Sequence, residues 1–198
     1  MPAFLRSSLF LHLVLALPAA LLVAGLANGE TWRFAIRPSG DFAAKLLVLV
    51  LCISPLRQLL PTADWTAWLV TGRRTFGLAA FAYAVFHLAV FCASIGRFDW
   101  IVQGMAFASM WTGWITFALL AAVASISHAA AKAHLGLWWK RIQRLAYPAA
   151  GLAVAHWLLL TASPWEALAH AVPVAVLWGA VAAKRLFSAA SAANNRAR

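Results

Sequence analysis

Two histidines stand deep inside long apolar runs of the sequence, and they are the side chains best suited to chemistry. His87 lies in a run that begins after Arg73 and Arg74, and His156 lies in a run that follows Arg141. An ionisable side chain inside a membrane span is costly, so we expect both histidines to be functional and to be partners. His87 follows Arg73 by 14 residues, and His156 follows Arg141 by 15. If their helices run in the same direction, the two imidazoles share one depth.

Facing imidazoles in a helix bundle suit the axial positions of a haem iron. Alanine precedes each histidine by three and by seven residues, which would leave room for a flat macrocycle: Ala84 and Ala80 before His87, and Ala153 and Ala149 before His156. We expect Tyr83, Phe76 and Phe91 to supply aromatic walls. Two other interpretations stay open, a proton relay and a simple hydrogen bond from each ring to a backbone carbonyl.

The composition is that of a membrane protein. The chain has 198 residues, of which 64% are hydrophobic and 11% charged, whereas soluble domains carry about 25% charged residues. The net charge is +11, and the Lys and Arg residues that carry it cluster in short gaps between apolar runs. No basic domain is therefore left to bind a nucleic acid. Cys52 and Cys92 lie within apolar runs, where buried apolar packing is the expected role.

Six apolar runs are each near the length of about 20 residues that a spanning helix needs. They cover about 7–27, 41–60, 73–95, 103–127, 140–162 and 166–187. We interpret the first as a retained helix, because its run is longer than the core of a signal peptide. With the N-terminus inside, twelve Lys and Arg lie inside and four outside. The sequence therefore predicts an all-α membrane protein, a six-transmembrane-helix bundle forming one domain over 1–198, with both termini cytoplasmic (N-in and C-in).

Several short segments resemble one family of membrane proteins. They are 54–57 (SPLR), 73–78 (RRTFGL), 81–83 (FAY) before His87, 135–136 (LG) and 139–147 (WKRIQRLAY) before His156. Over residues 40–165 the chain resembles the MsrQ (YedZ) family, the haem-binding membrane subunits of the periplasmic methionine-sulfoxide reductase system. That family belongs to the ferric-reductase-like transmembrane group.

The resemblance implies a haem b protein of the bacterial inner membrane, a multi-pass electron-transfer subunit without catalytic residues of its own. Family members pass electrons from the quinone pool, or from a cytosolic flavin reductase, to a periplasmic molybdopterin subunit (MsrP-like). That partner reduces methionine sulfoxide in oxidised proteins. His87 and His156 match the haem ligands of the family. The family is also associated with FMN, although the sequence contains no phosphate-binding motif.

One residue departs from the family pattern. Gln143 stands where family members carry a further histidine, and an amide nitrogen does not replace imidazole as an iron ligand. We therefore expect one haem per chain. Arg73, Arg74 and Arg144 are candidate cofactor-binding cations at the cytoplasmic face, for a flavin phosphate or haem propionates. Contact with lipid headgroups is the alternative role for these cations.

Three other functions fit parts of the pattern. A stand-alone ferric or cytochrome b561-like reductase would also carry haem, with its donor acting in trans. A proton-coupled transporter would use His87 and His156 as a relay, and a membrane scaffold would only pack them. The absorption spectrum of the purified protein separates the haem proteins from the two colourless alternatives.

Overall fold

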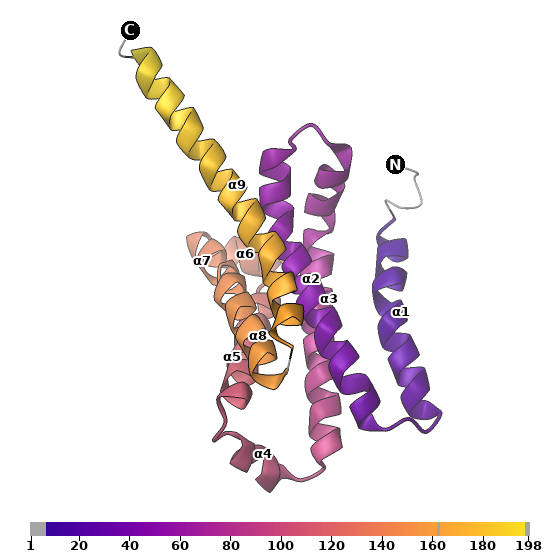
Figure 1. The fold of residues 1–198 in the computed structure, drawn as a ribbon. Coiled ribbons are helices and arrows are strands. Elements are labelled where there is room, and N and C mark those ends of the chain that lie inside the picture. The colour runs from indigo at the N-terminus through magenta and orange to yellow at the C-terminus, as the bar shows by residue number, and fades with distance from the viewer. Residues whose placement is uncertain (1–6, 162, 197–198) are drawn as a thin grey trace.

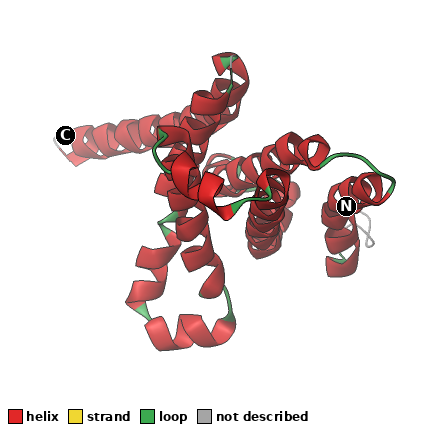
Figure 2. Ribbon diagram, turned by 90° about the horizontal axis from the view of Figure 1, so that it is seen from below, coloured by secondary structure: helices red, strands yellow, loops and turns green. Residues whose placement is uncertain are grey.

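The computed structural model describes residues 7–161 and 163–196, and this part of the chain is built of helices joined by short loops, without a strand (Figures 1 and 2). The helices are α1 (Ser8–Ala27), α2 (Trp32–Leu59), α3 (Asp64–Ile95), α4 (Phe98–Gly104), α5 (Ala108–Ser125), α6 (Ala129–Leu135), α7 (Leu137–Gln143), α8 (Ala146–Leu160) and α9 (Pro164–Arg196). The prediction of an all-α protein is confirmed.

Five of these helices are long and apolar enough to cross a membrane. The candidate spans are Leu9–Ala27, Trp32–Leu59, Asp64–Ile95, Ala108–Ser125 and Pro164–Ser191. Large apolar side chains cover their outer faces, as a hydrocarbon environment requires. The chain is a multi-pass membrane protein.

The predicted span 140–162 is not one continuous helix, because the helical path is interrupted between α7 and α8. Pro148 has no N–H to donate to the carbonyl of Arg144, and its ring would clash with that carbonyl in a continuous helix. The amides of Leu145 and Tyr147 instead bond the carbonyls three residues back, at 2.9 and 3.1 Å. The 15 residues of α8 rise only about 22 Å. The sixth crossing therefore stays a prediction.

Both α2 and α3 begin nine residues before their apolar runs. Arg33, Arg37, Asp41 and Lys45 recur every four residues at the start of α2, so one face of this amphipathic segment is charged. Ala35 and Ser39 lie on the opposite face, and both are fully buried. A search for apolar runs misses such a segment. The fourth predicted span was expected to begin at residue 103. Instead, the short helix α4 ends at Gly104, and the long helix α5 begins at Ala108.

Two helix pairs form the centre of the bundle, α2 with α3 and α5 with α8. Leu47, Ala80, Leu120 and Ala149, one from each of the four helices, are buried together in one core cluster. In Figure 1, α1 lies beside α2 and α3, while α9 crosses the bundle on the other side and extends beyond it.

The start of α1 and the end of α9 lie on the same side of the bundle, the upper side in Figure 1. This arrangement agrees with an even number of crossings. That this side is cytoplasmic stays a prediction. Arg6 and Arg198, which contributed to the cation count, and Ala162, at the start of a predicted outer loop, lie outside the described residues.

Candidate functional site

A cavity of about 640 Å³ lies between the two central helix pairs, and both candidate histidines line it. Its walls come from α2, α3, α5 and α8, with one residue from the first turn of α9. The apolar and aromatic wall residues are Ile36, Ala43, Ala44, Leu47, Ala84, Leu88, Phe91, Met110, Trp114, Phe117, Leu120, Ala153, Trp157 and Leu160. The structure therefore brings His87 and His156 to one site.

The ring of His87 is fixed by the backbone of α2. Its Nδ1 lies 2.9 Å from the carbonyl oxygen of Ile36 and 3.2 Å from Oγ of Ser39. A carbonyl only accepts, so Nδ1 must carry the proton and donate it. In the neutral ring Nε2 then holds a lone pair.

The ring of His156 is fixed in the same way by α5. Its Nδ1 lies 2.7 Å from the carbonyl oxygen of Ser109, so this nitrogen also donates. Within the described part of the chain, Nε2 of neither ring has a hydrogen-bond partner. Metal-binding histidines usually donate their second N–H to a carbonyl or carboxylate, which fixes the tautomer and the ring orientation. The carbonyl bonds are thus compatible with ligation through Nε2.

Two glycines provide the space in which the rings lie. A Cβ on Gly40 would lie 3.1 Å from Cε1 and Nδ1 of His87. A Cβ on Gly113 would lie 2.8 Å from Cε1 and 3.0 Å from Nδ1 of His156. A Cβ at Gly113 would collide with the imidazole, and one at Gly40 would force the ring of His87 to shift by a few tenths of an ångström. The close approach of helix and ring therefore favours glycine at both positions.

The residues present fit a haem group. Both rings leave a lone pair for a metal, and the cavity volume falls within the range of about 300–1,000 Å³ that cofactor sites occupy. The residues described here contain no group of three or more His, Cys, Asp or Glu that could hold a bare metal ion. Porphyrin supplies four equatorial nitrogens itself, so two imidazoles complete the coordination of its iron.

The neighbours expected around the histidines are only partly at the cavity. Ala84, Ala153 and Phe91 line it, whereas Ala80 and Ala149 lie beneath it in the core cluster. Phe76 does not line the cavity. It packs against α2 residues and the ring of Trp68 instead.

Tyr83 lies away from the cavity and holds α1. Its hydroxyl accepts from the amide of Ala19 at 3.0 Å and donates to the carbonyl of Leu15 at 2.8 Å. These two backbone groups would bond each other in an uninterrupted helix, so the hydroxyl is inserted into α1 beside Pro18. The structure therefore gives Tyr83 a role in attaching α1 to α3.

The predicted cytoplasmic cations do not reach the histidine cavity. Arg73 donates to Oγ of Ser54 at 2.7 Å, and Arg74 and Arg144 are exposed. Gln143 ties α7 to the end of α5, because its Nε2 donates to Oγ of Ser127 at 3.2 Å and to the carbonyl of Val123 at 3.5 Å. Binding of a cofactor by these cations stays a prediction.

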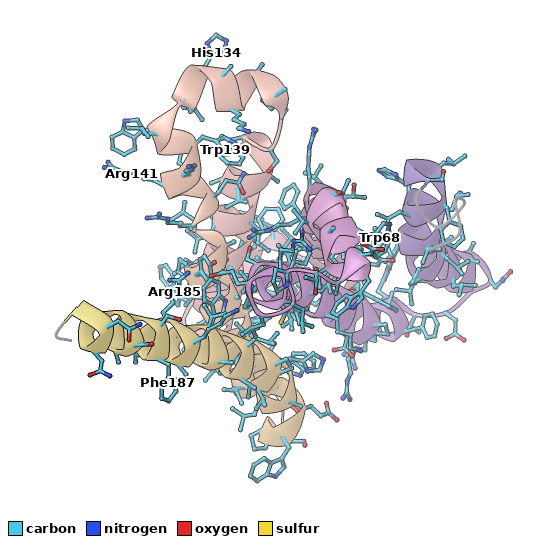
Figure 3. The ribbon with its side chains drawn as sticks, turned by 90° about the horizontal axis from the view of Figure 1, so that it is seen from above. Trp68, His134, Trp139, Arg141, Arg185 and Phe187 are labelled. Atoms are coloured by element: carbon cyan, nitrogen blue, oxygen red, sulfur yellow. The ribbon has the colours of Figure 1, made fainter. Side chains whose placement is uncertain are left out.

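Of the other four histidines, His12, His128 and His134 are exposed and His170 is half-buried. His128 accepts from the amide of Ala131 and caps α6. Figure 3 shows His134 pointing away from the bundle at its edge. His170 donates to the carbonyl of Glu166 at 2.7 Å and stacks on Trp157, with ring centroids 4.7 Å apart. His12 lies on α1. None of the four lines the cavity.

Sequence reasoning missed the contribution of α2 and α5 to the site. Each helix carries a hydroxyl residue followed by glycine, Ser39-Gly40 and Thr112-Gly113. Each hydroxyl lies close to the carbonyls four and three residues back in its helix. For Ser39 Oγ the two distances are 2.7 and 2.9 Å, and for Thr112 Oγ1 they are 3.1 and 3.0 Å. In both helices the carbonyl three residues back, of Ile36 or Ser109, is the one that holds the histidine. The repeated hydroxyl–glycine pair was a usable signal in the sequence.

Comparison with known proteins supplies a family. The chain is 34% identical over 152 residues to the protein-methionine-sulfoxide reductase heme-binding subunit MsrQ of Azospira oryzae. The chain belongs to the MsrQ family. The match covers 72% of this chain and 62% of the length of the MsrQ relative. No protein-family model matches the sequence, and no solved structure matches it.

Proposed function

We propose that this chain binds haem b between His87 and His156 and transfers electrons across the bacterial inner membrane. The observation that supports this most directly is the matched pair of imidazoles. Both are anchored through Nδ1 to a backbone carbonyl, both lie against a glycine, and both line one cavity. The relative in Azospira oryzae is named as a heme-binding subunit, which agrees with this assignment.

The arrangement suits electron transfer better than reaction with a substrate. When bound, the haem would supply a one-electron couple, and His87 and His156 would be the residues that hold its iron, with no site left there for a substrate. The protein residues hold the two rings in fixed orientations and exclude water with apolar walls. Ligand identity, hydrogen bonds to the ligands and burial then set the redox potential.

We place the chain in a methionine-sulfoxide reductase system, as the membrane subunit that delivers electrons outward to a periplasmic molybdopterin reductase. The quinone pool or a cytosolic flavin reductase is the donor in this proposal. The name of the relative supports the reductase system, and the apolar helices support the membrane location. FMN binding is carried over from the family alone.

The absorption spectrum of the purified protein tests the haem assignment. Wild-type protein should show a low-spin haem b spectrum. His87→Ala and His156→Ala should each remove most of the haem, because one axial ligand is lost. His128→Ala and His170→Ala are matched controls on histidines that do not line the cavity, and they should keep the wild-type spectrum. A colourless wild-type protein would exclude haem, and an unchanged reduced spectrum in His87→Ala protein would exclude this ligand pair.

A further inference from the structure

The histidine cavity changes in polarity from one end to the other. Its inner end, near the core cluster, is apolar and includes Leu47, Ala84 and Leu120. Apart from the two histidines and Thr116, whose hydroxyl donates to the carbonyl of Thr112, its polar and charged wall residues gather where α2 begins and where α8 passes into α9. They are Arg37, Asp41, Thr161, Ser163 and Glu166. A ligand with one apolar edge and one polar edge would therefore bind in a single orientation, with the polar edge at this outer end.

The charges at the outer end are unequal. In the described part of the cavity wall, Arg37 is the one cation, facing the carboxylates of Asp41 and Glu166. Asp41 has its own partner, since its Oδ2 lies 3.8 Å from Nζ of Lys45, one helical turn further on. Arg37 forms an ion pair with Glu166, on the first turn of α9.

The pair between Arg37 and Glu166 is easily exchanged. Its side chains are 69% and 45% exposed, and ion pairs in contact with water contribute little to stability. A guanidinium has five N–H donors in a planar fork, which matches a carboxylate at two points. Another carboxylate that arrives with a buried ligand can therefore replace Glu166 on Arg37 without a large loss.

We propose that Arg37 binds the carboxylates of the cavity ligand, the haem propionates, and that Glu166 takes their place on Arg37 when the cavity is empty. This assignment rests on the proposed haem function. It puts the propionate-binding cation at the outer end of α2, away from Arg73, Arg74 and Arg144. Glu166 competes with the propionates for Arg37 and also repels them, so it weakens binding of the ligand.

Reconstitution with two forms of haem tests the proposal. Apoprotein purified in detergent is titrated with haem b and with its dimethyl ester, in which both propionates are uncharged, and binding is followed by the low-spin spectrum. Arg37→Gln should weaken binding of haem by about two- to fivefold, as loss of a solvent-exposed ion pair implies, and leave binding of the ester unchanged. Arg37→Lys should recover part of the loss, because it restores the charge without the fork. Each variant is compared with wild type for the same ligand, so the different solubilities of the two ligands cancel.

Two further variants sharpen the test. Arg33→Gln is the matched control, because Arg33 lies one turn before Arg37, is exposed and does not line the cavity. It should bind both ligands as wild type does. Glu166→Gln should strengthen binding of haem and not of the ester, since it releases Arg37. Added salt should reduce the wild-type preference for haem over the ester.

The outcomes separate this proposal from the function on which it rests. If wild type binds haem and Arg37→Gln binds it equally well, the propionate site is wrong and the haem function stands. If Arg37→Gln weakens haem and ester to the same extent, Arg37 supports the fold and the proposal is again wrong. If wild-type protein binds neither ligand, the haem function itself fails.

Discussion

Replacing Gly113 by alanine tests whether the close approach of α5 to His156 is essential to the site. The new Cβ would lie 2.8 Å from Cε1 and 3.0 Å from Nδ1 of the imidazole, both closer than carbon and nitrogen atoms normally pack. The ring is rigid, and its Nδ1 is held at 2.7 Å from the carbonyl of Ser109. It can escape the clash only by moving away from that carbonyl.

The cost follows from the contacts. Overpacking a filled site costs about 1–3 kcal/mol. A weakened hydrogen bond to Ser109 adds about 0.5–1.5 kcal/mol. Alanine offsets about 0.5–1 kcal/mol of this through its better helix propensity. The net loss of about 0.5–4 kcal/mol, centred near 2 kcal/mol, lowers haem affinity by about 2-fold to 1,000-fold, with a central value of about 30-fold.

Haem titration of apoprotein measures the loss, with circular dichroism to show that the variant stays helical. Gly151→Ala, on α8 itself, and Gly77→Ala, on α3, are matched controls because nothing lies within 4 Å of their added Cβ atoms. Both should bind haem as wild type does. The loss of haem affinity in Gly40→Ala should lie between that of Gly113→Ala and that of the controls, since its Cβ would approach the ring of His87 only to 3.1 Å. Wild-type affinity in Gly113→Ala, or an equal loss in Gly151→Ala, would refute the argument.

Three further predictions concern the hydroxyls and the number of haems. Ser39→Ala and Thr112→Ala each free a carbonyl that the hydroxyl shares with a histidine, so the Nδ1–H bond strengthens and the ligand donates more electron density. Redox titration should show a lower haem potential in both, whereas Ser39→Thr and Thr112→Ser should keep it. An unchanged potential would mean that the hydroxyls only pack. Tyr83→Phe should lower the free energy of unfolding by about 1–3 kcal/mol in denaturant titrations, because two backbone groups of α1 lose their partner, and it should keep the haem. Loss of haem in the Tyr83→Phe variant would show that Tyr83 contributes to the haem site. Extracted haem against total protein should give a ratio near one, and a ratio near two would show a second site.

Much of the fold was predictable from the sequence because apolar runs report membrane spans directly. The helix ends were less so. The start of α2 carries a charged stripe through Arg33 and Arg37 that no search for apolar runs detects. Pro148 interrupts the predicted span 140–162 within a segment of apolar residues, so hydropathy does not mark the interruption. Both histidines were predictable because a buried ionisable group is conspicuous in such a chain. Their carbonyl partners were not, since a backbone carbonyl has no signature in the sequence. A glycine alone carries no chemical signal either, and only the repeated hydroxyl–glycine pair marks Gly40 and Gly113.

The site is an internal repeat, and this repeat bears on how many ligand layers the bundle holds. Gly40 and Gly113 are 73 residues apart, whereas His87 and His156 are 69 apart, so the two units differ in their connections and no constant sequence period reveals them. In space each unit supplies one histidine, one glycine and one carbonyl to the same cavity.

A second ligand layer built on the same repeat would need two ligating side chains, each the same number of residues before its histidine. Thirteen residues before each stand Arg74 and Gln143. Arg74 lies about 20 Å along α3 from His87, whereas Gln143 ends α7, before the interruption that separates it from His156 on α8. A protonated guanidinium cannot ligate iron, and the amide of Gln143 is already bonded to Ser127 and Val123. The repeat therefore supplies a pair of ligands only at the layer of His87 and His156, which is the physical reason for expecting one haem per chain.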